Sequence, residues 1–285
     1  MRTPLSSAPV DAPSLAAPLL EKYTALREWL GTLESAVTAY SGGVDSTLVA
    51  VLAHQALGSR ALAVTSGSES LKREELDLAE SLARRWGFAH RVIVTREMAL
   101  PAYRANPANR CYFCKTTLYA DLRHLARTEG FAVLLNGTNA DDLGDHRPGL
   151  KAAEEHGVQT PLSRFGLTKA EVRALAHHLG LPNHDKPQSA CLSSRVQYGL
   201  SISPEVLRQI EQAESLLKSL GFRQLRVRHH EALARIEVPL EDLERVVALR
   251  QTIESGLRTL GYRYVTLDLG GFRSGSMNEI LPGRG

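Results

Sequence analysis

Residues 40–46 read Tyr-Ser-Gly-Gly-Val-Asp-Ser and directly follow a short apolar run. Gly42 and Gly43 let the backbone approach an anion closely, and Ser41 and Ser46 add hydroxyl donors. If a helix begins here, its N-terminus also directs N–H groups at the anion. The segment lacks both the Gly-Lys-Ser/Thr ending of the kinase-type loop and the dinucleotide fingerprint. It therefore predicts a phosphate loop for a different nucleotide chemistry, the alternative being a tight turn without a ligand.

Three cysteines, the only ones in the chain, form a second chemical group. Cys111 and Cys114 stand three apart in RCYFCK, and Cys191 lies in KPQSACLSSR. The residues alone leave four interpretations: a redox-active pair, a zinc site completed by His184, a four-iron cluster with three protein ligands, and burial as small apolar groups. We expect RCYFCK just before a helix, without the flanking pattern of a thioredoxin-like domain, and a redox pair gives Cys191 no role.

The scaffold for these groups follows from the stretch 36–136, in which short apolar runs alternate with helical patterns. This rhythm is typical of a parallel sheet covered by helices. The runs are AVTAY, ALAVTS, HRVIVT and FAVLLN, and the helical patterns include DSTLVAVLAHQAL and residues 71–86. Continuous apolar strands fit burial on both faces. Since ligands of such sheets bind beyond the carboxyl ends of the strands, the phosphate loop should lie at that edge.

The pattern changes after Gly199 and predicts a second, smaller α/β domain. Its expected elements are a helix at 204–220, strands at 224–229 and 234–238, a helix at 241–260 and a strand at 264–269. We place the boundary near 198–203. The expected regions are a disordered tail at 1–17, the main domain at 18–200, and a domain for substrate binding or oligomerisation at 201–285.

Composition excludes several classes of protein. The net charge of +3 is too small to indicate a nucleic-acid surface. No apolar run approaches the roughly 18 residues that cross a bilayer, and prolines interrupt the N-terminal tail where a secretory signal needs an apolar core. An odd number of cysteines argues against a disulfide framework and for a reducing compartment. We therefore expect a cytoplasmic protein that binds neither nucleic acid nor membranes.

The string SGGVDS resembles the signature of the N-type ATP pyrophosphatases, which cleave ATP between its α- and β-phosphates and transfer AMP to a carbonyl oxygen. The resemblance implies a doubly wound parallel α/β fold that uses ATP and Mg²⁺. It implies that Asp45 helps to hold magnesium on the pyrophosphate, with Asp141 of GTNADD as a candidate partner. The residues implied to bind ATP are Ser41, Gly42, Gly43, Asp45, Ser46 and Ser66.

Two further segments resemble this family in the expected order. VTSGSES, which contains Ser66, is similar to the turn that contacts adenine and ribose. The segment TPLSRFGLTKAEVR is similar to a Pro-Leu…Lys…Glu-Val-Arg helix. For this second segment a capped surface helix is an equal alternative, because Thr168 and Glu171 have the spacing of a capping box.

Beyond the phosphate loop, the chain resembles the LarE family, the ATP-dependent sulfur transferases that make the nickel-pincer nucleotide of lactate racemase. The distinctive segments are NGTNADDLGDHRPGLKAAEEHGV, ACLSSR, RVRHHEALARIEV and GGFRSGSMNE. The resemblance implies a pyridinium mononucleotide substrate whose two carboxylates are adenylated and then converted to thiocarboxylates. It also suggests a hexamer built from trimers.

The cysteines bear on the sulfur source within that family. In some members one cysteine at the position of Cys191 gives up its sulfur and ends as dehydroalanine. Cys111 and Cys114, which single-cysteine members lack, imply instead the branch with a [4Fe–4S] cluster held by Cys111, Cys114 and Cys191. Sulfide on the open iron is then the donor, supplied by a sulfur source that the sequence does not name.

Cations should surround the leaving AMP and the anionic groups of the substrate. Next to the cysteines we select Lys115 and Arg195. Arg226, Arg228 and Arg273 stand in family-like segments of the second domain, where guanidinium groups can hold phosphate or carboxylate bidentately. A solvated strand face is the alternative for these three. Glu214 is a weaker candidate for metal or subunit contacts.

Three other functions remain as alternatives. A tRNA thiolase shares the loop but needs an RNA surface, against which the modest charge counts. An amidotransferase-like ligase such as an NAD synthetase shares the loop and needs no cysteines. A regulatory nucleotide-binding module would bind ATP without cleaving it.

Overall fold

A computed structural model describes residues 14–144, 148–273 and 277 of the chain. Residues 1–13 of the expected tail lie outside this range. The chain forms two compact units. The larger unit extends to Gly67 and adds Arg73–Thr95 and Cys111–Ser189, whereas the smaller unit consists of Ser68–Lys72, Arg96–Arg110 and the chain from Ala190 onward. The smaller unit thus takes in two segments that lie well before position 200.

The larger unit contains a parallel sheet with the strand order β3-β2-β1-β4. Its strands are β1 (Ala36–Ala39), β2 (Ala61–Ser66), β3 (Ala89–Ile93) and β4 (Val133–Leu135). Its α-helices are α1 (Ala17–Gly31), α2 (Val44–Leu57), α3 (Arg73–Trp86), α5 (Arg110–Glu129), α6 (Pro148–Glu155), α7 (Pro161–Arg164) and α8 (Lys169–His178). The predicted doubly wound α/β fold is confirmed.

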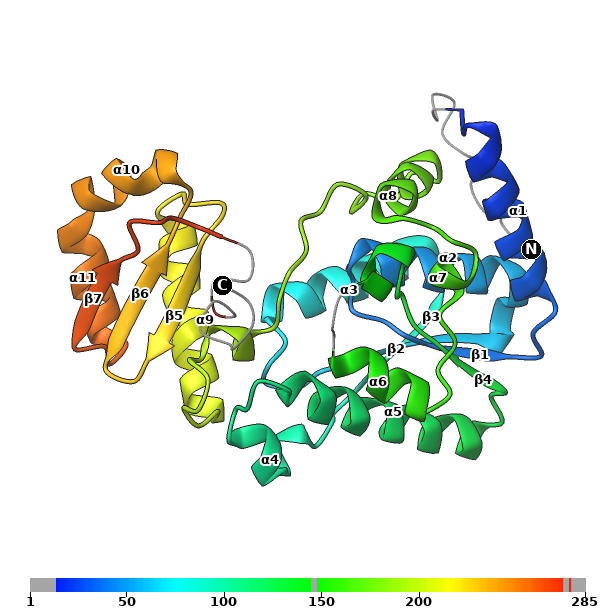
Figure 1. Cartoon of the computed structure of the whole chain (residues 1–285), viewed down its shortest axis with the longest axis horizontal. Helices are drawn as coiled ribbons and strands as arrows, with labels where there is room; N and C mark the ends of the chain where they lie inside the picture. The colour runs from blue at the N-terminus through cyan, green and yellow to red at the C-terminus, as the bar shows by residue number, and fades with distance from the viewer. Residues whose placement is uncertain (1–13, 145–147, 274–276, 278–285) are drawn as a thin grey trace. The chain divides into compact units, whose positions relative to one another are not determined.

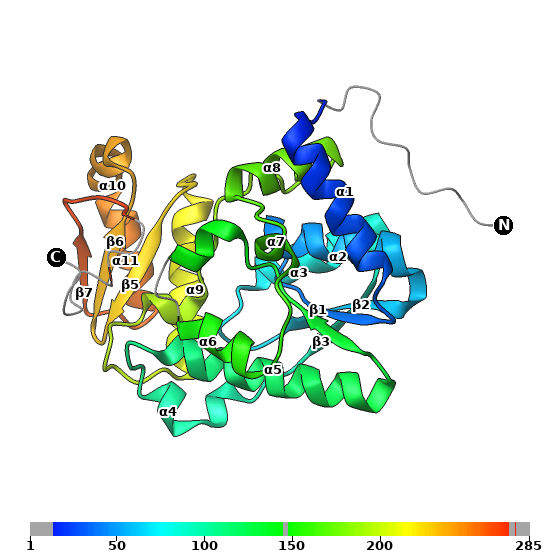
Figure 2. The ribbon, with the colours of Figure 1, turned by 45° about the vertical axis from the view of Figure 1, so that its right-hand side comes forward.

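Helices cover both faces of this sheet, because alternate strand residues point to opposite sides. Ala36 and Ala63 belong to the core with α1, α2, α3 and α8, whereas Val37 and Val64 belong to the core with α5 and α6. Figures 1 and 2 show α2 and α5 on opposite faces. The apolar runs of β1 and β2 are therefore buried on both sides, as predicted.

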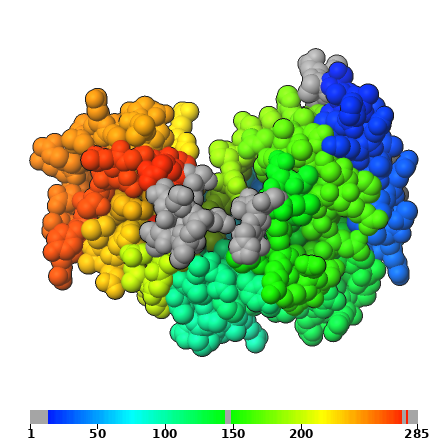
Figure 3. All heavy atoms as spheres, viewed as in Figure 1, coloured from blue at the N-terminus to red at the C-terminus, as the bar shows by residue number. Residues whose placement is uncertain are grey.

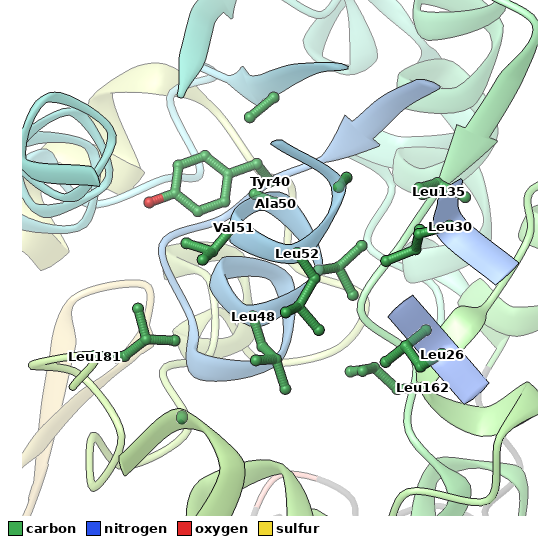
Figure 4. Close-up of a cluster of buried hydrophobic side chains, with 14 of the residues drawn as sticks. Leu26, Leu30, Tyr40, Leu48, Ala50, Val51, Leu52, Leu135, Leu162 and Leu181 are labelled. Carbon is green, nitrogen blue, oxygen red and sulfur yellow. The ribbon is translucent and has the colours of Figure 1, made fainter. Parts of the chain in front are cut away.

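The centre of the first core is α2, which is buried almost all round. Leu48, Val51 and Leu52 belong to the same core as Leu26 and Leu30 of α1, and Figure 4 shows that Leu52 points toward the two α1 side chains. The helix α1, dark blue in Figure 3, lies on the outside of the unit and turns one apolar stripe inward. A helix as apolar as α2 needs cover on all sides, and here α1 and the strands of the sheet contribute to the same core.

The strand β3 departs from the pattern of the other strands. It is one of the two edge strands of the sheet, and all five of its residues are exposed or half-buried. Beyond its end, the side chain of Val94 is 76% exposed. The apolar run HRVIVT is therefore a half-covered edge, since no further strand of the described chain pairs with its outer side.

The smaller unit has a three-stranded sheet with the order β5-β6-β7. The strands β5 and β6 pair antiparallel, and β6 and β7 pair parallel. Its elements are α4 (Pro101–Arg104), α9 (Pro204–Ser219), β5 (Arg226–His230), β6 (Leu233–Glu237), α10 (Leu243–Ala248), α11 (Arg250–Thr259) and β7 (Tyr264–Leu267). The helix expected at 241–260 is divided at Leu249.

Short 3₁₀ turns connect several of these elements. They are η1 (Gly58–Arg60), η2 (Glu97–Ala99), η3 (Ala140–Gly144), η4 (Leu192–Arg195) and η5 (Leu240–Asp242). Among the described residues, no helix has the length and apolar character required to span a membrane.

Candidate active site

The phosphate loop lies at the point where the order of the strands reverses. From β1 the chain continues to β2 and β3 on one side, and β4 lies on the other side of β1. In open α/β sheets this reversal opens a crevice beyond the carboxyl ends of the strands. Residues 40–46 follow β1 there and run into α2, whereas 137–142 follow β4. Both predicted ATP segments therefore start at the same edge.

Internal hydrogen bonds hold the phosphate loop in shape. The Ser41 amide donates to Ser46 Oγ at 3.2 Å, and the two hydroxyl oxygens lie 3.1 Å apart. Ser46 Oγ also lies 3.2 Å from the Gly43 carbonyl, to which it donates. Gly43 is the N-cap of α2, whose first amides have no acceptor within the helix. The loop thus offers preorganised N–H and O–H donors to an anion.

Two glycines permit close approaches around this loop. Gly42 has φ +72°, a left-handed conformation that side chains disfavour, and a Cβ there would lie 3.2 Å from Cβ of Ala79. A Cβ on Gly137 would come within 2.6 Å of the Ser46 nitrogen. The segment after β4 therefore packs directly on the beginning of α2, and only glycine fits at position 137.

Asp45 is held from two directions. Asn139 Nδ2 donates to Asp45 Oδ1 at 3.1 Å, and Lys169 Nζ forms a hydrogen-bonded ion pair with Oδ2. Lys169 is the first residue of α8, which the predicted capping box of Thr168 and Glu171 fixes at its start. The capping interpretation of this helix is confirmed, and the same helix also delivers a cation to the phosphate loop.

Asp141, the proposed partner of Asp45, contacts the same lysine. Its Oδ2 accepts the backbone N–H of Lys169 at 2.8 Å, and its own amide donates to Asn139 Oδ1 at 3.0 Å. Carboxylates and amide oxygens are ligands that Mg²⁺ accepts, so the donor set fits this ion. Within residues 14–144, 148–273 and 277, however, no three His, Cys, Asp or Glu side chains form a metal-binding group.

Asn183 fixes the backbone of the loop from the segment after α8. Its side chain is 4% exposed, and Nδ2 donates at 3.0 Å both to the Gly42 carbonyl and to Thr47 Oγ1. The C=O and N–H groups of one trans peptide point in opposite directions. Because the Gly42 carbonyl points toward Asn183, the Gly43 N–H is directed into the loop. Asn183 therefore sets the orientation of the Gly42–Gly43 peptide.

Ser66 ends β2 at the same edge of the sheet. Its hydroxyl lies 2.5 Å from that of Thr95, which follows β3 and is 4% exposed. The next residue, Gly67, donates its amide to the Ile93 carbonyl at 2.8 Å. The turn assigned to adenine and ribose is therefore attached to the neighbouring strand.

The cysteines of RCYFCK lie inside a helix rather than before one. Cys111 and Cys114 occupy the beginning of α5, where residues three apart share a face. Cys111 and Cys191 are exposed, and Cys114 is half-buried. Cys191 belongs to the smaller unit. His184, the alternative zinc ligand, stacks on another histidine with ring centroids 4.5 Å apart.

Of the two cations chosen near the cysteines, Lys115 is exposed and Arg195 is not. Lys115 lies on α5 with Nζ 6.0 Å from the ring centroid of Tyr119. Arg195 has a side-chain exposure of 0%, and its Nε donates to Glu214 Oε1 at 2.9 Å. Arg195 therefore directs its guanidinium into the smaller unit, a location that sequence could not distinguish from a substrate contact.

The three arginines of the second domain have different surroundings. Arg228 is buried and pairs with Glu237, its Nη2 lying 2.8 Å from Oε2. Arg273 is exposed, with Nη1 3.9 Å from Asp268 Oδ1. Arg226 forms no ion pair with a carboxylate within the described part of the chain, and its guanidinium lies over the ring of Phe272 at 4.9 Å.

Arg226 is therefore the arginine best suited to accept an outside anion. Burial, followed by the nearby charge of Arg195, lowers the pKa of Arg226 to about 10. A cation with this lowered pKa gains most from an added anion, because the anion offsets the lost hydration.

Comparison with known proteins now identifies the family. Residues 34–180 match the asparagine synthase family. Over 266 residues, 93% of this chain and 96% of the relative, the chain is 39% identical to the pyridinium-3,5-bisthiocarboxylic acid mononucleotide synthase of Lactiplantibacillus plantarum. The chain belongs to the LarE family of ATP-dependent transferases.

Two further relatives of this LarE family member are named as uncharacterised proteins. An uncharacterised protein of Synechocystis sp. is 46% identical over 92% of this chain and 99% of its own length. One of Methanocaldococcus jannaschii is 29% identical over 84% of this chain and 90% of its own. The asparagine synthase match covers β1 to α8 and so includes the phosphate loop, Asn139 and Lys169, but ends before Asn183 and Cys191.

Sequence reasoning missed three residues of the candidate site, namely Lys169, Asn139 and Asn183. Lys169 was visible in the segment compared with a family helix, yet its spacing also fits a surface helix. Asn139 sits between the glycine and the aspartates of GTNADD. For Asn183, no local signal separates a buried hydrogen-bonding role from a loop asparagine.

Proposed function

We propose that this chain uses ATP to adenylate the carboxylates of a pyridinium dicarboxylate mononucleotide and then converts them to thiocarboxylates. The name of the L. plantarum relative, together with 39% identity over 93% of the chain, supports this substrate class. The observation that carries the proposal is the loop at residues 40–46, where preorganised donors surround an anion site next to Asp45.

Adenylation is the first step of the proposed reaction. A carboxylate oxygen of the substrate attacks the α-phosphorus of ATP, the bond to the β-phosphate breaks, and pyrophosphate leaves. The amides at the start of α2 and the hydroxyls of Ser41 and Ser46 bind the departing phosphates. Ser66 is assigned to the adenosine. Asp45, with Asp141 as the second candidate ligand, would hold Mg²⁺, whose charge would offset that of the pyrophosphate.

Lys169 has a defined part in this step. Its ammonium holds Asp45 Oδ2, and its backbone amide holds Asp141 Oδ2. The two carboxylates are therefore oriented by one residue at the start of α8. Lys169 also adds a positive charge beside the position of the leaving pyrophosphate, where negative charge develops.

Sulfur transfer is the second step. Hydrosulfide attacks the acyl carbon of the adenylate, the bond to AMP breaks, and AMP leaves with the electron pair while one proton is released. We propose that Cys111, Cys114 and Cys191 hold a [4Fe–4S] cluster, because three thiolates and no fourth cysteine suit such a ligand set. The cluster supplies an iron that can carry sulfide. Lys115 and Arg195 are proposed as the cations near these cysteines that stabilise the negative charge of the leaving AMP and of the substrate.

The substrate's phosphate and carboxylates are assigned to Arg226, Arg228 and Arg273 of the smaller unit. The absence of a carboxylate partner for Arg226 in the described chain supports its part in this assignment. Arg228 and Arg273 already contact acidic residues, so they contribute fewer unused donors.

The proposed reaction takes place in a reducing compartment. Three cysteines without a disulfide framework favour the cytoplasm. The main domain, 18–200, would carry ATP chemistry, and 201–285 would bind substrate and mediate assembly into a hexamer. The partners are a nucleotide substrate and a sulfide source, without nucleic acid or membrane.

The test is an anaerobic assay of the purified protein with ATP, Mg²⁺, sulfide and pyridinium-3,5-dicarboxylic acid mononucleotide. We expect pyrophosphate release, thiocarboxylate formation over many turnovers, about four irons per chain and a visible iron–sulfur absorption. Replacing any one cysteine by alanine should remove iron and thiocarboxylate but keep pyrophosphate release.

A different outcome would point to the single-cysteine mechanism. In that case Cys191 loses the mass of hydrogen sulfide, about 34 Da, after one turnover, and anaerobic protein holds no iron. Pyrophosphate release without any dependence on the pyridinium substrate would instead reject the proposed substrate class.

A further inference from the structure

The exposed Cys191 lies on a loop, residues 190–195, whose backbone is held from within the smaller unit. We call this segment the Cys191 loop. Arg195 Nη1 donates to the Ala190 carbonyl at 2.6 Å and to the Cys191 carbonyl at 2.9 Å. Ser194 Oγ adds a bond of 2.7 Å to the Cys191 carbonyl. The guanidinium of Arg195 thus fixes both peptide planes around the cysteine.

Glu214 of α9 in turn fixes that guanidinium. Its Oε1 accepts from Arg195 Nε at 2.9 Å and from the Val227 amide at 3.2 Å. The carboxylate is 3% exposed. Burial tends to raise the pKa of Glu214, but the charges of Arg195 and Lys72 lower it to about 2. Glu214 is therefore an ionised anchor between a helix, a strand and the Cys191 loop.

Lys72 completes this buried group from a distant part of the chain. Its Nζ lies 2.5 Å from Glu214 Oε2, and its side chain is 7% exposed. Arg195 Nη2 reaches the same oxygen only at 3.4 Å. Lys72 thus lies closer to Oε2 than Arg195 does. It therefore sets the rotation of the Glu214 carboxylate, and this rotation in turn determines where the guanidinium of Arg195 lies.

The segment that carries Lys72 also braces the loop directly. The Ser70 carbonyl accepts the amide of Leu192, the residue after Cys191, at 2.8 Å. Residues 68–72 therefore fix the backbone around Cys191 in two ways. One is the bond between Ser70 and Leu192, and the other is the series of contacts through Lys72, Glu214 and Arg195. This segment follows Ser66 and Gly67 directly in the chain.

We infer that Lys72, Glu214 and Arg195 form a positioning relay that fixes the backbone at Cys191 and so orients its thiol for sulfur transfer. That the relay orients the thiol for sulfur transfer rests on the proposed function, whereas that it fixes the backbone does not. In this relay Arg195 acts through the loop, because its side chain is fully buried in the smaller unit. A buried ion group is a weak source of stability, since apolar residues of similar volume can replace it. In this protein its role is to fix the positions of the Ala190 and Cys191 carbonyls.

The test compares Lys72→Met and Glu214→Gln with Lys72→Arg in the full-length anaerobic protein. Lys72→Met leaves one cation and one anion, so it should fold even if Glu214→Gln does not. Hydrogen exchange of the amides in 190–196 should accelerate about tenfold in both variants and stay near wild type in Lys72→Arg. Pyrophosphate release should change less than about twofold, while thiocarboxylate formation falls about tenfold.

Glu237→Gln is the matched control, because Glu237 is also buried and paired with an arginine of the same unit. Its partner Arg228 donates to the Ser194 carbonyl at 3.0 Å, whereas the described side-chain donors to the carbonyls of residues 190 and 191 are Arg195 and Ser194. Unchanged exchange of the Cys191 loop in Lys72→Met, or equal acceleration in Glu237→Gln, overturns the inference. A parallel fall of pyrophosphate release and thiocarboxylate overturns it as well. If wild type makes no thiocarboxylate, the proposed function fails while hydrogen exchange still tests the backbone role.

Discussion

Asn183 gives a sharp test of how the phosphate loop is held. Its Nδ2 donates to the Gly42 carbonyl and to Thr47 Oγ1, both at 3.0 Å. Only the NH₂ group of the Asn183 amide can donate a hydrogen bond to a carbonyl, so the orientation of the side chain is determined. Asn183→Asp keeps the size of the side chain and removes this donor. The Gly42–Gly43 peptide is then no longer fixed.

The expected loss follows from these two bonds. A neutral hydrogen bond contributes about 1 kcal/mol net, so losing both costs about 1–3 kcal/mol of unfolding free energy. If about half of this free energy is also lost from pyrophosphate binding, pyrophosphate affinity falls about two- to twelvefold, since 1.4 kcal/mol equals a factor of ten. AMP affinity should change less than about twofold, because the proposed function assigns the Gly42–Gly43 peptide to the phosphates that leave.

The assay is titration calorimetry with pyrophosphate and, separately, with AMP, alongside urea denaturation. Ser35→Ala is the control variant. Ser35 is also buried and makes two hydrogen bonds, to Ala132 and Gly130, but it lies at the amino end of β1. Ser35→Ala should lose similar stability with normal pyrophosphate binding. Wild-type pyrophosphate affinity in Asn183→Asp would refute the reasoning.

Three further outcomes are expected. Arg228→Ala should cost about 1.5–3 kcal/mol in urea denaturation because it removes two charge-assisted hydrogen bonds from buried Glu237, which then keeps its contact with Arg235 at 3.1 Å, whereas Arg226→Ala should cost under about 1 kcal/mol, and equal losses would contradict the pairing. The lowered pKa of Glu214, about 2 against 4.5, means that its contribution is complete above pH 4.5 and disappears as the pH falls toward 2. Acid titration of wild type and Glu214→Gln should therefore show stabilities that converge in that range. Chelation of Mg²⁺ should stop pyrophosphate release and magnesium should restore it, and release in its absence would contradict the assigned metal role.

Local sequence was sufficient for the scaffold and for the first element of the site. The apolar runs at 36–39 and 61–66 predicted buried parallel strands, because a strand covered on both faces needs no polar alternation. The serines and glycines after the first strand predicted the loop, and Thr168 with Glu171 predicted the start of α8. These signals lie within a few residues of one another, where backbone geometry alone relates them.

Contacts between distant segments were decided only by the tertiary structure. Lys169 reaches Asp45 across 124 positions, Asn183 reaches Gly42 across 141, and Lys72 reaches Glu214 across 142. A lysine at the start of a helix or before one has the same local pattern whether it faces water or a carboxylate. Its partner is fixed by the order of the strands and by helix packing, which bring together residues that no sequence period connects.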